Sequence, residues 1–502
     1  MGVGERPAWS GTRAARRRTG WIDFRPILFV IGHMLVVLAA AMIVPALVDA
    51  AEHHPDWQGF LASAVITAFL GGALVATNRV ERPKLNRRQG FLLTTLSWIA
   101  LSAFGGLPFL LSNLHFSYAA AFFETMSGLT TTGSTVLVGL DEAPPGILMW
   151  RALLQWIGGV GIIAMAVIML PFLRVGGMQL FRTESSDRSE KVLPRPSQII
   201  AAICSTYLVL TVLCFAAYWA AGMTLFEAVC HAMTTVSTGG YSTSDDSIGH
   251  FKSALIDWIA IVFMFSGAVP LIGFYRMVHG EPLALWRDSQ VRVFFWIIVG
   301  ASVAIGLWRW SVSEQPLSEA LRHSAFSVVS IITTSGFATV DYNQWGGVAA
   351  VAIFILTFVG GCTGSTSGGL KVFRLEIMAI VLRYQLRRLV QPRGVFPKLY
   401  NGEPVSDEVA MSVIAFSYVY VAAFALLAAA LAAYGLDFLT ATTAAATAVG
   451  NVGPGLGDVI GPTGNFSSLP DGAKWLFSLG MLVGRLELFT VLVLFAPRFW
   501  RD

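Results

Sequence analysis

Long apolar segments alternate with short polar connections along most of the chain. Runs of at least 18 mostly apolar residues occur between Ile27 and Ala496, and each run can cross a hydrocarbon layer of ~30 Å as a helix. Only 13% of the 502 residues are charged, whereas 55% are hydrophobic, a balance that is rare in soluble proteins. The pattern therefore predicts an all-α polytopic membrane protein surrounded by a lipid bilayer.

The apolar segments form an initial transmembrane hairpin, at 27–80, and then four similar units. Each unit begins with a long helix, continues with a short apolar segment and a glycine-containing loop, and ends with a second long helix. The predicted units are 88–174, 196–279, 289–390 and 405–498, with short segments near 118–129, 225–236, 317–332 and 437–449. The second long helices are expected near 146–173, 252–279, 345–388 and 472–497.

The short segments cannot cross the membrane. A helix of about 12 residues is only ~18 Å long, so each segment must enter the membrane and return to the same side. Non-helical backbone at membrane depth is tolerated only where protein buries it or where it lines water. We therefore expect the four units to surround one central pore, with their loops facing a common aqueous axis.

The four loops align on one glycine each. They read "TTTGST" (130–135), "VSTGGY" (236–241), "TTSGFA" (333–338) and "GNVGPG" (450–455). Glycine reaches positive φ without steric cost, which allows successive carbonyls to face one side, and rings of carbonyls can replace the hydration shell of a cation. Ordinary turns are the alternative, because glycine and serine are common turn residues. The candidate ion-binding residues are Thr131, Thr132, Gly133, Ser237, Thr238, Gly239, Thr334, Ser335, Gly336, Asn451, Val452 and Gly453.

Basic residues gather at alternate connections. The clusters are the N-terminal tail (1–26) and the segments at 79–88, 172–191, 276–292 and 382–393. The connections near 51–57, 112–145, 223–250 and 435–471 contain no lysine or arginine, so the distribution follows the positive-inside rule. We expect both termini and the basic connections to be cytoplasmic. The net charge of +4 is explained in this way, and no nucleic-acid partner is predicted.

The second helix of the third unit is interrupted. Its apolar part, 346–360, would form a helix of only ~22 Å, and "GCTGSTSGG" follows at 361–369. We predict an intramembrane loop at 360–369, directly below the glycine loops; a flexible cytoplasmic turn is the alternative. A phosphate-binding loop is excluded, because the last glycine is not followed by Lys and then Ser or Thr and no strand precedes the segment.

Three charged residues lie near this loop or in the last apolar segment. Arg485 lies near the middle of that segment, where a charge costs ~2.5–3.5 kcal/mol and usually faces a cavity or a partner. Glu487 cannot pair face-on with Arg485, two positions earlier on the same helix, so we expect it to brace another helix. Lys371 is interpreted as an interfacial lysine rather than as a second gate residue.

The sequence contains no pattern typical of an enzyme. Four cysteines and eight histidines show no metal-ligand spacing, and we expect no organic cofactor. A polytopic membrane enzyme would need Asp, Glu or His residues that converge on one loop. A coupled transporter built from inverted repeats would need halves that run in opposite directions, whereas the four units all begin on the inside.

Taken together, the four loops resemble those of the Trk/Ktr/HKT potassium transporter superfamily. The stretches "GGCTGSTSGGLKVFR" (360–374) and "GRLELF" (484–489), with the extra N-terminal hairpin, narrow the resemblance to the bacterial TrkH type. Tyr241 stands where phenylalanine is frequent in that type, and we expect little effect. The resemblance implies potassium uptake across the inner membrane. Glycine at all four aligned positions goes with potassium preference, and serine at the first goes with sodium conduction; here that residue is Gly133.

The resemblance also implies a gate and partners. Its gate residues are Arg485, Gly361, Cys362, Thr363, Gly364, Ser365, Thr366, Ser367 and Gly368. The implied transported ion is K⁺, and the implied partners are a second copy of the chain and a cytosolic nucleotide-binding regulatory subunit of the TrkA type. A sodium-coupled Ktr-type transporter and a less selective monovalent cation channel remain the alternatives.

Overall fold

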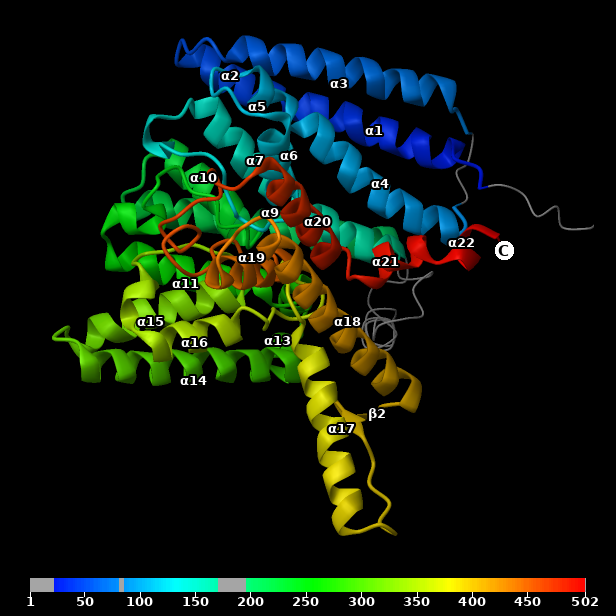
Figure 1. Ribbon diagram of the computed structural model, residues 1–502, viewed down its shortest axis with the longest axis vertical. Coiled ribbons are helices and arrows are strands. Elements are labelled where there is room, and N and C mark those ends of the chain that lie inside the picture. Colours follow the sequence, from blue (N-terminus) through cyan, green and yellow to red (C-terminus); the bar gives the residue numbers. More distant parts are fainter. Residues whose placement is uncertain (1–21, 81–84, 170–195, 502) are drawn as a thin grey trace, which may run out of the picture.

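The computed structural model describes residues 22–80, 85–169 and 196–501. Most of the basic tail at 1–26 and the basic segment at 172–191 lie outside the described residues. The described chain is almost entirely helical (Figure 1). It contains six helices that are long and apolar enough to cross a membrane, or up to eight if each sharply bent helix pair counts as one span. The prediction of an all-α polytopic membrane protein is therefore confirmed.

The N-terminal hairpin lies along one flank of the molecule (Figure 1). It consists of α1 (Arg25–Ala41), α2 (Ile43–Ala51) and α3 (Trp57–Thr77). An added Cβ at Gly32 would lie 2.8 Å from the carbonyl oxygen of Gly71, and one at Gly71 would lie 2.9 Å from that of Gly32. Small residues thus let α1 and α3 approach closely, as in many membrane helix pairs.

The remaining helices follow the predicted order along the chain. That they form four repeated units with the predicted boundaries stays a prediction. The first two units contain α4 (Arg87–Gly105), α5 (Leu107–Leu111), α6 (Tyr118–Leu129) and α7 (Pro145–Met169), then α9 (Pro196–Ala220), α10 (Leu225–Val236), α11 (Ala254–Ala268) and α12 (Leu271–Val278). The short helix α13 (Ala284–Arg287) lies between the second and third units. The last two units contain α14 (Ser289–Val312), α15 (Leu317–Ile332), α16 (Gly347–Leu356) and α17 (Val372–Val390), then α18 (Asp407–Ala432), α19 (Phe438–Gly450), α20 (Asp471–Arg485), α21 (Phe489–Leu492) and α22 (Pro497–Arg501).

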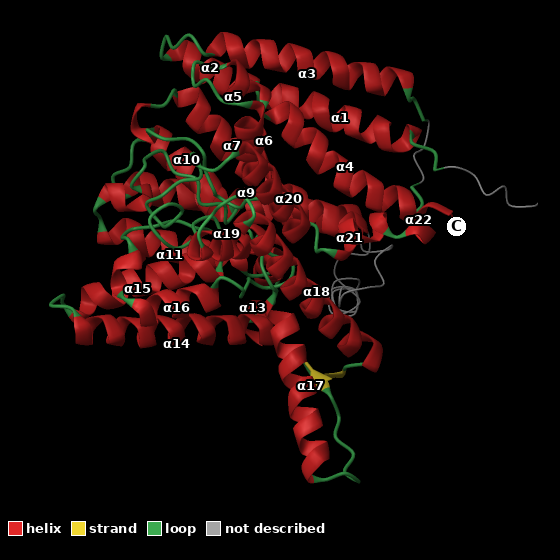
Figure 2. Cartoon of the chain, viewed as in Figure 1, coloured by secondary structure: helices red, strands yellow, loops and turns green. Residues whose placement is uncertain are grey.

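Short single-turn helices and one hairpin complete the description. The 3-10 turns are η1 (Leu140–Glu142), η2 (Ser247–Phe251), η3 (Tyr342–Trp345) and η4 (Val493–Phe495). The strands β1 (Leu399–Tyr400) and β2 (Glu403–Pro404) pair antiparallel, and together with α17 they project from the helical body (Figure 1). Figure 2 shows that much of the loop backbone lies within the body, among α10, α11 and α19.

Two of the predicted second helices are not continuous, so the expectation of single helices at 252–279 and 472–497 is wrong. The chain bends by 95° between α11 and α12 and by 107° between α20 and the α21–η4 segment. At the first bend, Pro270 has no N–H to donate within a helix. The carbonyls of Gly267 and Ala268 instead accept from the N–H groups of Thr366 and Cys362, at 3.1 and 2.9 Å.

The second bend is held by a charged contact between helices. Glu487 and Leu488 both have positive φ, which ends the helix that contains Arg485. The Glu487 carboxylate pairs with the guanidinium of Arg374, a buried residue of α17. That guanidinium also lies 3.7 Å from the centre of the Phe416 ring, a cation–π arrangement. The expectation that Glu487 braces another helix is confirmed.

Candidate functional site

Four short helices point into the protein interior and lead to the glycine loops. They are α6, α10, α15 and α19. Every residue of α6 from Ala119 to Leu129 is buried, so this helix is surrounded by protein rather than by lipid. The C-terminal end of each helix lies next to a loop, and the negative end of its dipole favours a cation there.

Polar side chains cap the outer ends of three of these helices. Ser117 accepts from the N–H of Ala120 at the start of α6, and Thr224 forms a capping box with Glu227 at the start of α10. At the start of α19, hydrogen bonds from Thr440 lower the pKa of Asp437. The Asp437 carboxylate therefore stays ionised at the positive end of the helix dipole.

The four loops share one backbone conformation. Within two residues of the helix end, one residue has φ between +52° and +58° in every loop, and two positions later a glycine has φ between +80° and +101°. The hydrogen bonds also repeat, because the intervening residue donates its N–H to the carbonyl five residues earlier. The three positions are Thr131, Thr132 and Gly133; Thr238, Gly239 and Gly240; Thr334, Ser335 and Gly336; and Asn451, Val452 and Gly453.

The sequence alignment of the second loop is therefore wrong by one residue. Gly240, with φ of +81°, corresponds to the other three glycines, and Gly239 takes the intervening position. Ser237 is the C-cap residue of α10 and lies one position before the shared conformation. Two adjacent glycines made the sequence ambiguous. The signal that could have resolved it is the aromatic residue after the glycine, since Tyr241 follows Gly240 as Phe337 follows Gly336.

The four loops close into a ring. An added Cβ at each of the four positive-φ glycines would lie less than 3.0 Å from a carbonyl oxygen of the next loop. The pairs are Gly133 with Gly239, Gly240 with Ser335, Gly336 with Val452, and Gly453 with Thr132. The first loop therefore faces the second, the second the third, the third the fourth and the fourth the first. Each contact involves the carbonyl of the same loop position.

Buried polar side chains hold the ring from behind. Asn451 donates to the Thr132 hydroxyl at 3.0 Å and to the Met481 carbonyl at 2.9 Å, which joins the fourth loop to the first and to α20. Glu124 of α6 forms a buried ion pair with Arg151 of α7, at 2.8 Å. Glu124 was not among the predicted site residues. The sequence holds no signal for it beyond a lone acid in an apolar helix.

The Glu124–Arg151 pair also connects two loops. A Glu124 oxygen accepts from the N–H of Val136 at 2.9 Å, just after the first glycine loop. Arg151 donates to the Ser242 carbonyl at 2.9 Å, just after the second. Its guanidinium lies 4.0 Å from the centre of the Tyr241 ring. One ion pair therefore fixes the outer ends of both loops relative to α6 and α7.

The interrupted segment of the third unit lies directly against the glycine loops. Thr366 donates to the Val236 carbonyl at 3.1 Å, and its hydroxyl is 3.1 Å from that of Thr238. The hydroxyl of Thr334 is 3.1 Å from that of Ser367 and accepts from the N–H of Gly368 at 2.7 Å. The second and third loops are thus bonded to this segment.

The interrupted segment is also an ordered part of the interior. Except for Thr363 and Gly364, which are half-buried, residues 361–368 are buried. Internal bonds run from the Gly361 N–H to the Ser367 hydroxyl, at 2.9 Å, and from the Ser365 hydroxyl to the Cys362 carbonyl, at 2.6 Å. This burial and hydrogen bonding argue against the alternative of a flexible cytoplasmic turn.

Two basic residues lie close to this region. Arg485 is only 4% exposed, and its Nε and Nη2 atoms have no hydrogen-bond partner within the part of the chain that the structure describes. Lys371 donates from Nζ to the carbonyl of Ser367. Lys371 thus points at the interrupted segment, and its interpretation as an interfacial lysine stays a prediction.

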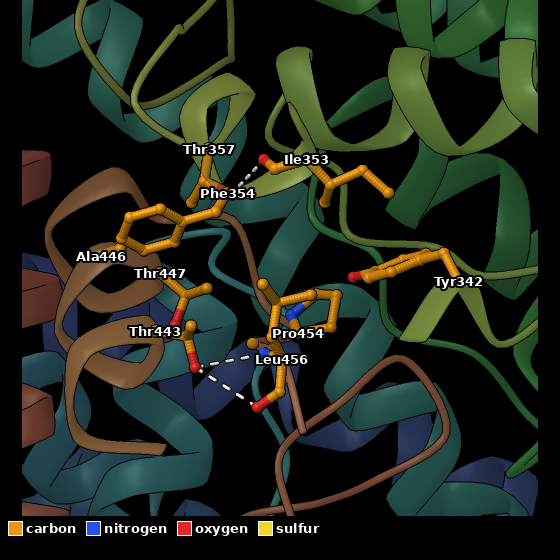
Figure 3. Close-up of a pocket in the computed structure, with 10 residues that line it drawn as sticks. Tyr342, Ile353, Phe354, Thr357, Thr443, Ala446, Thr447, Pro454 and Leu456 are labelled. Atoms are coloured by element: carbon orange, nitrogen blue, oxygen red, sulfur yellow. Dashed lines mark hydrogen bonds between the residues drawn. The ribbon is translucent and has the colours of Figure 1, made fainter. Parts of the chain in front are cut away.

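A small cavity lies behind the fourth loop (Figure 3). Its lining includes Tyr342, Thr357 of the α16 end, Thr443 of α19, and Pro454. Thr443 accepts from the N–H of Leu456 at 3.1 Å. A cavity of about 10 Å³ has room for about one water molecule.

Within residues 22–80, 85–169 and 196–501, no group of three or more His, Cys, Asp or Glu side chains could hold a metal ion.

Comparisons with known proteins agree on one family. Residues 57–502 match the model of the family described as "TrkH: Cation transport protein". The chain is 46% identical over 479 residues to the "Trk system potassium uptake protein TrkI" of Halomonas elongata, covering 95% of this chain and 97% of that protein. It is 37% identical over 489 residues to the "Trk system potassium uptake protein TrkH" of Escherichia coli (strain K12), covering 96% and 100%.

A solved structure has the same fold. The crystal structure of the potassium transporter TrkH from Vibrio parahaemolyticus matches with a TM-score of 0.88 and 37% sequence identity, and the match covers 96% of this chain and 100% of that chain.

The ring geometry predicts that a methyl group at Gly240 is far more damaging than backbone strain alone. Gly240→Ala combines positive φ with overlap on the Ser335 carbonyl, whereas Gly435→Ala meets no atom within 4 Å at a similar φ of +86°. We expect Gly435→Ala to cost about 1 kcal/mol and Gly240→Ala about 1–3 kcal/mol more. Thermal unfolding in detergent measures the difference. Equal midpoints for the two variants would contradict the close packing of the ring.

Proposed function

Because the chain belongs to the TrkH family of cation transport proteins, we propose that it takes up potassium through the ring of four glycine loops. The observation that carries this proposal is the ring itself, in which each positive-φ glycine leaves space for a carbonyl oxygen of the next loop. Four peptide oxygens around one axis can replace water around an alkali cation. The relatives that carry the name "Trk system potassium uptake protein" support potassium as the ion.

The ring supplies the two requirements of a selectivity filter. Oxygen ligands come from the carbonyls of Thr132, Gly239, Ser335 and Val452, and the four short helices direct the negative ends of their dipoles toward the same region. Protein burial keeps this non-helical backbone out of contact with lipid. An ion entering from outside therefore exchanges its hydration shell for fixed dipoles at little reorganisation cost.

Uptake follows from the membrane potential. An inside-negative potential contributes ~2.3 kcal/mol per elementary charge per 100 mV, which corresponds to roughly 50-fold accumulation of K⁺ at equilibrium. A gated pathway of this kind sustains uptake without a chemical step in this chain. We place the protein in the bacterial inner membrane with both termini in the cytoplasm, on the basis of the positive-inside distribution.

The interrupted segment and Arg485 form the gate in this proposal. Residues 361–368 are hydrogen-bonded to the second and third loops, and the positive-inside rule puts them on the cytoplasmic side of the ring in this proposal. Arg485 and Lys371 add positive charge below it, and a desolvated positive charge repels a passing cation.

Regulation is assigned to partners. We propose that the protein works as a homodimer with a cytosolic nucleotide-binding subunit of the TrkA type. The support is the Trk system to which the named relatives belong. The projecting α17 and its hairpin β1–β2 (Figure 1) lie on the side that the positive-inside rule assigns to the cytoplasm.

Flux measurements test the transport proposal. Liposomes that contain the purified chain should take up ⁸⁶Rb⁺, and external K⁺ should compete far better than Na⁺, because the ring replaces the hydration shell of the larger ion. Empty liposomes are the control. Equal competition by Na⁺ and K⁺ would support the less selective channel instead, a requirement for Na⁺ would support the sodium-coupled transporter, and an absence of uptake would contradict the proposal.

Neutralising Arg485 should increase basal flux. Arg485→Gln removes the charge below the ring while preserving most of the side-chain volume, so we expect ⁸⁶Rb⁺ uptake per folded protein to rise about tenfold, the effect of ~1.4 kcal/mol on a barrier. Arg393→Gln, an exposed change in the connection after α17, is the matched control. Unchanged uptake in Arg485→Gln would exclude Arg485 from the gate.

A further inference from the structure

We propose that Gln155 of α7 is a positioning residue that fixes the ion preference of the ring by holding the second loop. The inference rests on the proposed function and names a determinant of selectivity at the same site. Gln155 is fully buried, and its side-chain amide contacts the ring from behind.

The second loop differs from the other three at its intervening position. Thr132, Ser335 and Val452 carry side chains there, whereas the second loop has Gly239. The φ of Gly239 is not in the left-handed region, so the backbone conformation does not require glycine. Glycine is required here because a side chain would have no room. An added Cβ at Gly239 would lie less than 3.0 Å from three atoms of the Gln155 amide group.

The Gln155 amide makes two complementary hydrogen bonds to this loop. Its Nε2 donates to the Gly239 carbonyl at 2.6 Å, and its Oε1 accepts from the N–H of Tyr241 at 3.0 Å. The two bonds fix which end of the amide is which, because the reversed amide would place acceptor against acceptor and donor against donor. The side chain thus pairs with the loop as a neighbouring peptide would.

The carbonyl that Gln155 holds is a member of the ring. The Gly239 oxygen faces Gly133 of the first loop, as the corresponding oxygens of the other loops face their neighbours. A glycine without its own side chain is otherwise the least constrained of the four positions. The preference between K⁺ and Na⁺ depends on the positions and the field strength of the carbonyl oxygens. The hydrogen bond from Gln155 affects both the position and the field strength of the Gly239 oxygen.

The element that presents Gln155 is itself fixed. Arg151 lies one helical turn earlier on α7, so both side chains are on the same face. Arg151 is held by Glu124 and donates to Ser242, while the Tyr241 hydroxyl donates to the Glu124 carbonyl at 2.8 Å. Gln155 therefore reaches the second loop from a helix that is already tied to the residues that follow that loop.

The first test removes only the amide. Gln155→Leu preserves the bulk of the side chain but makes neither hydrogen bond. In the ⁸⁶Rb⁺ liposome assay we expect uptake to persist and the ratio of K⁺ to Na⁺ competition to fall about fivefold, the factor that one hydrogen bond of about 1 kcal/mol provides. Gln344→Leu, an exposed residue of η3, is the control that should keep the wild-type ratio.

The second test exchanges the side chain between helix and loop. Gly239→Ser alone should lose nearly all uptake, because its Cβ collides with Gln155. The double variant Gly239→Ser/Gln155→Ala gives the second loop the residue that the third loop has at Ser335 and removes the obstacle. We expect the double variant to recover at least tenfold more uptake than Gly239→Ser, a non-additive result that reports direct coupling.

The outcomes separate the two proposals. If the wild-type chain shows no preference for K⁺ over Na⁺, the proposed function fails. If the wild-type prefers K⁺ and folded Gln155→Leu retains that preference in full, the role of Gln155 is overturned. If Gln155→Leu cannot be purified as a folded protein, the second test settles the question. Recovery of ⁸⁶Rb⁺ uptake by Gly239→Ser/Gln155→Ala supports the inference, and uptake no higher than that of Gly239→Ser overturns it.

Discussion

The structure depends on one steric constraint, the absence of a Cβ at four glycines that face the carbonyl oxygens of their neighbouring loops. An added methyl group at any of them would overlap the next loop, and the positive φ there is strained for any other residue. The contacts run from each loop to the next and back to the first. The ring therefore closes only if none of the four positions carries a Cβ. The constraint is thus cooperative, and it sets how closely four backbones approach one axis.

Much of the remaining interior serves to hold these backbones in place. Short helices that are too short to span the membrane deliver the loops, and their outer ends are capped by polar side chains. The buried pair of Glu124 and Arg151 fixes two loops, and Asn451 ties the fourth loop to the first. The interrupted segment of the third unit then bonds to the ring from below. The ring and the interrupted segment are therefore one hydrogen-bonded body, which offers a physical route by which a change in the segment reaches the carbonyl oxygens of the ring.

Hydrophobic patterning predicted the long helices and the four short ones, since both follow from length and polarity. It did not predict the bends near Pro270 and Leu488, because each is fixed by contacts with a distant part of the chain: the hydrogen bonds from residues 362 and 366 at the first bend and the pairing of Glu487 with Arg374 at the second. It also placed the second loop one residue early, because two adjacent glycines satisfy the same local pattern and only the aromatic residue that follows the second of them, as in the third loop, distinguishes them in the sequence. The sequence did not predict the role of Gln155 for a related reason. Its amide contacts Gly239, 84 residues away along the chain, in space that is open only because Gly239 has no side chain.

The central claim is that an alkali cation occupies the axis of the ring. Anomalous scattering from crystals of the full chain grown with Rb⁺ tests it most directly. The account predicts a peak between the four loops, at roughly 3 Å from the carbonyl oxygens of Thr132, Gly239, Ser335 and Val452, because these oxygens replace the hydration shell of the ion. A ring that encloses no peak, with Rb⁺ bound elsewhere along the protein, would contradict the account.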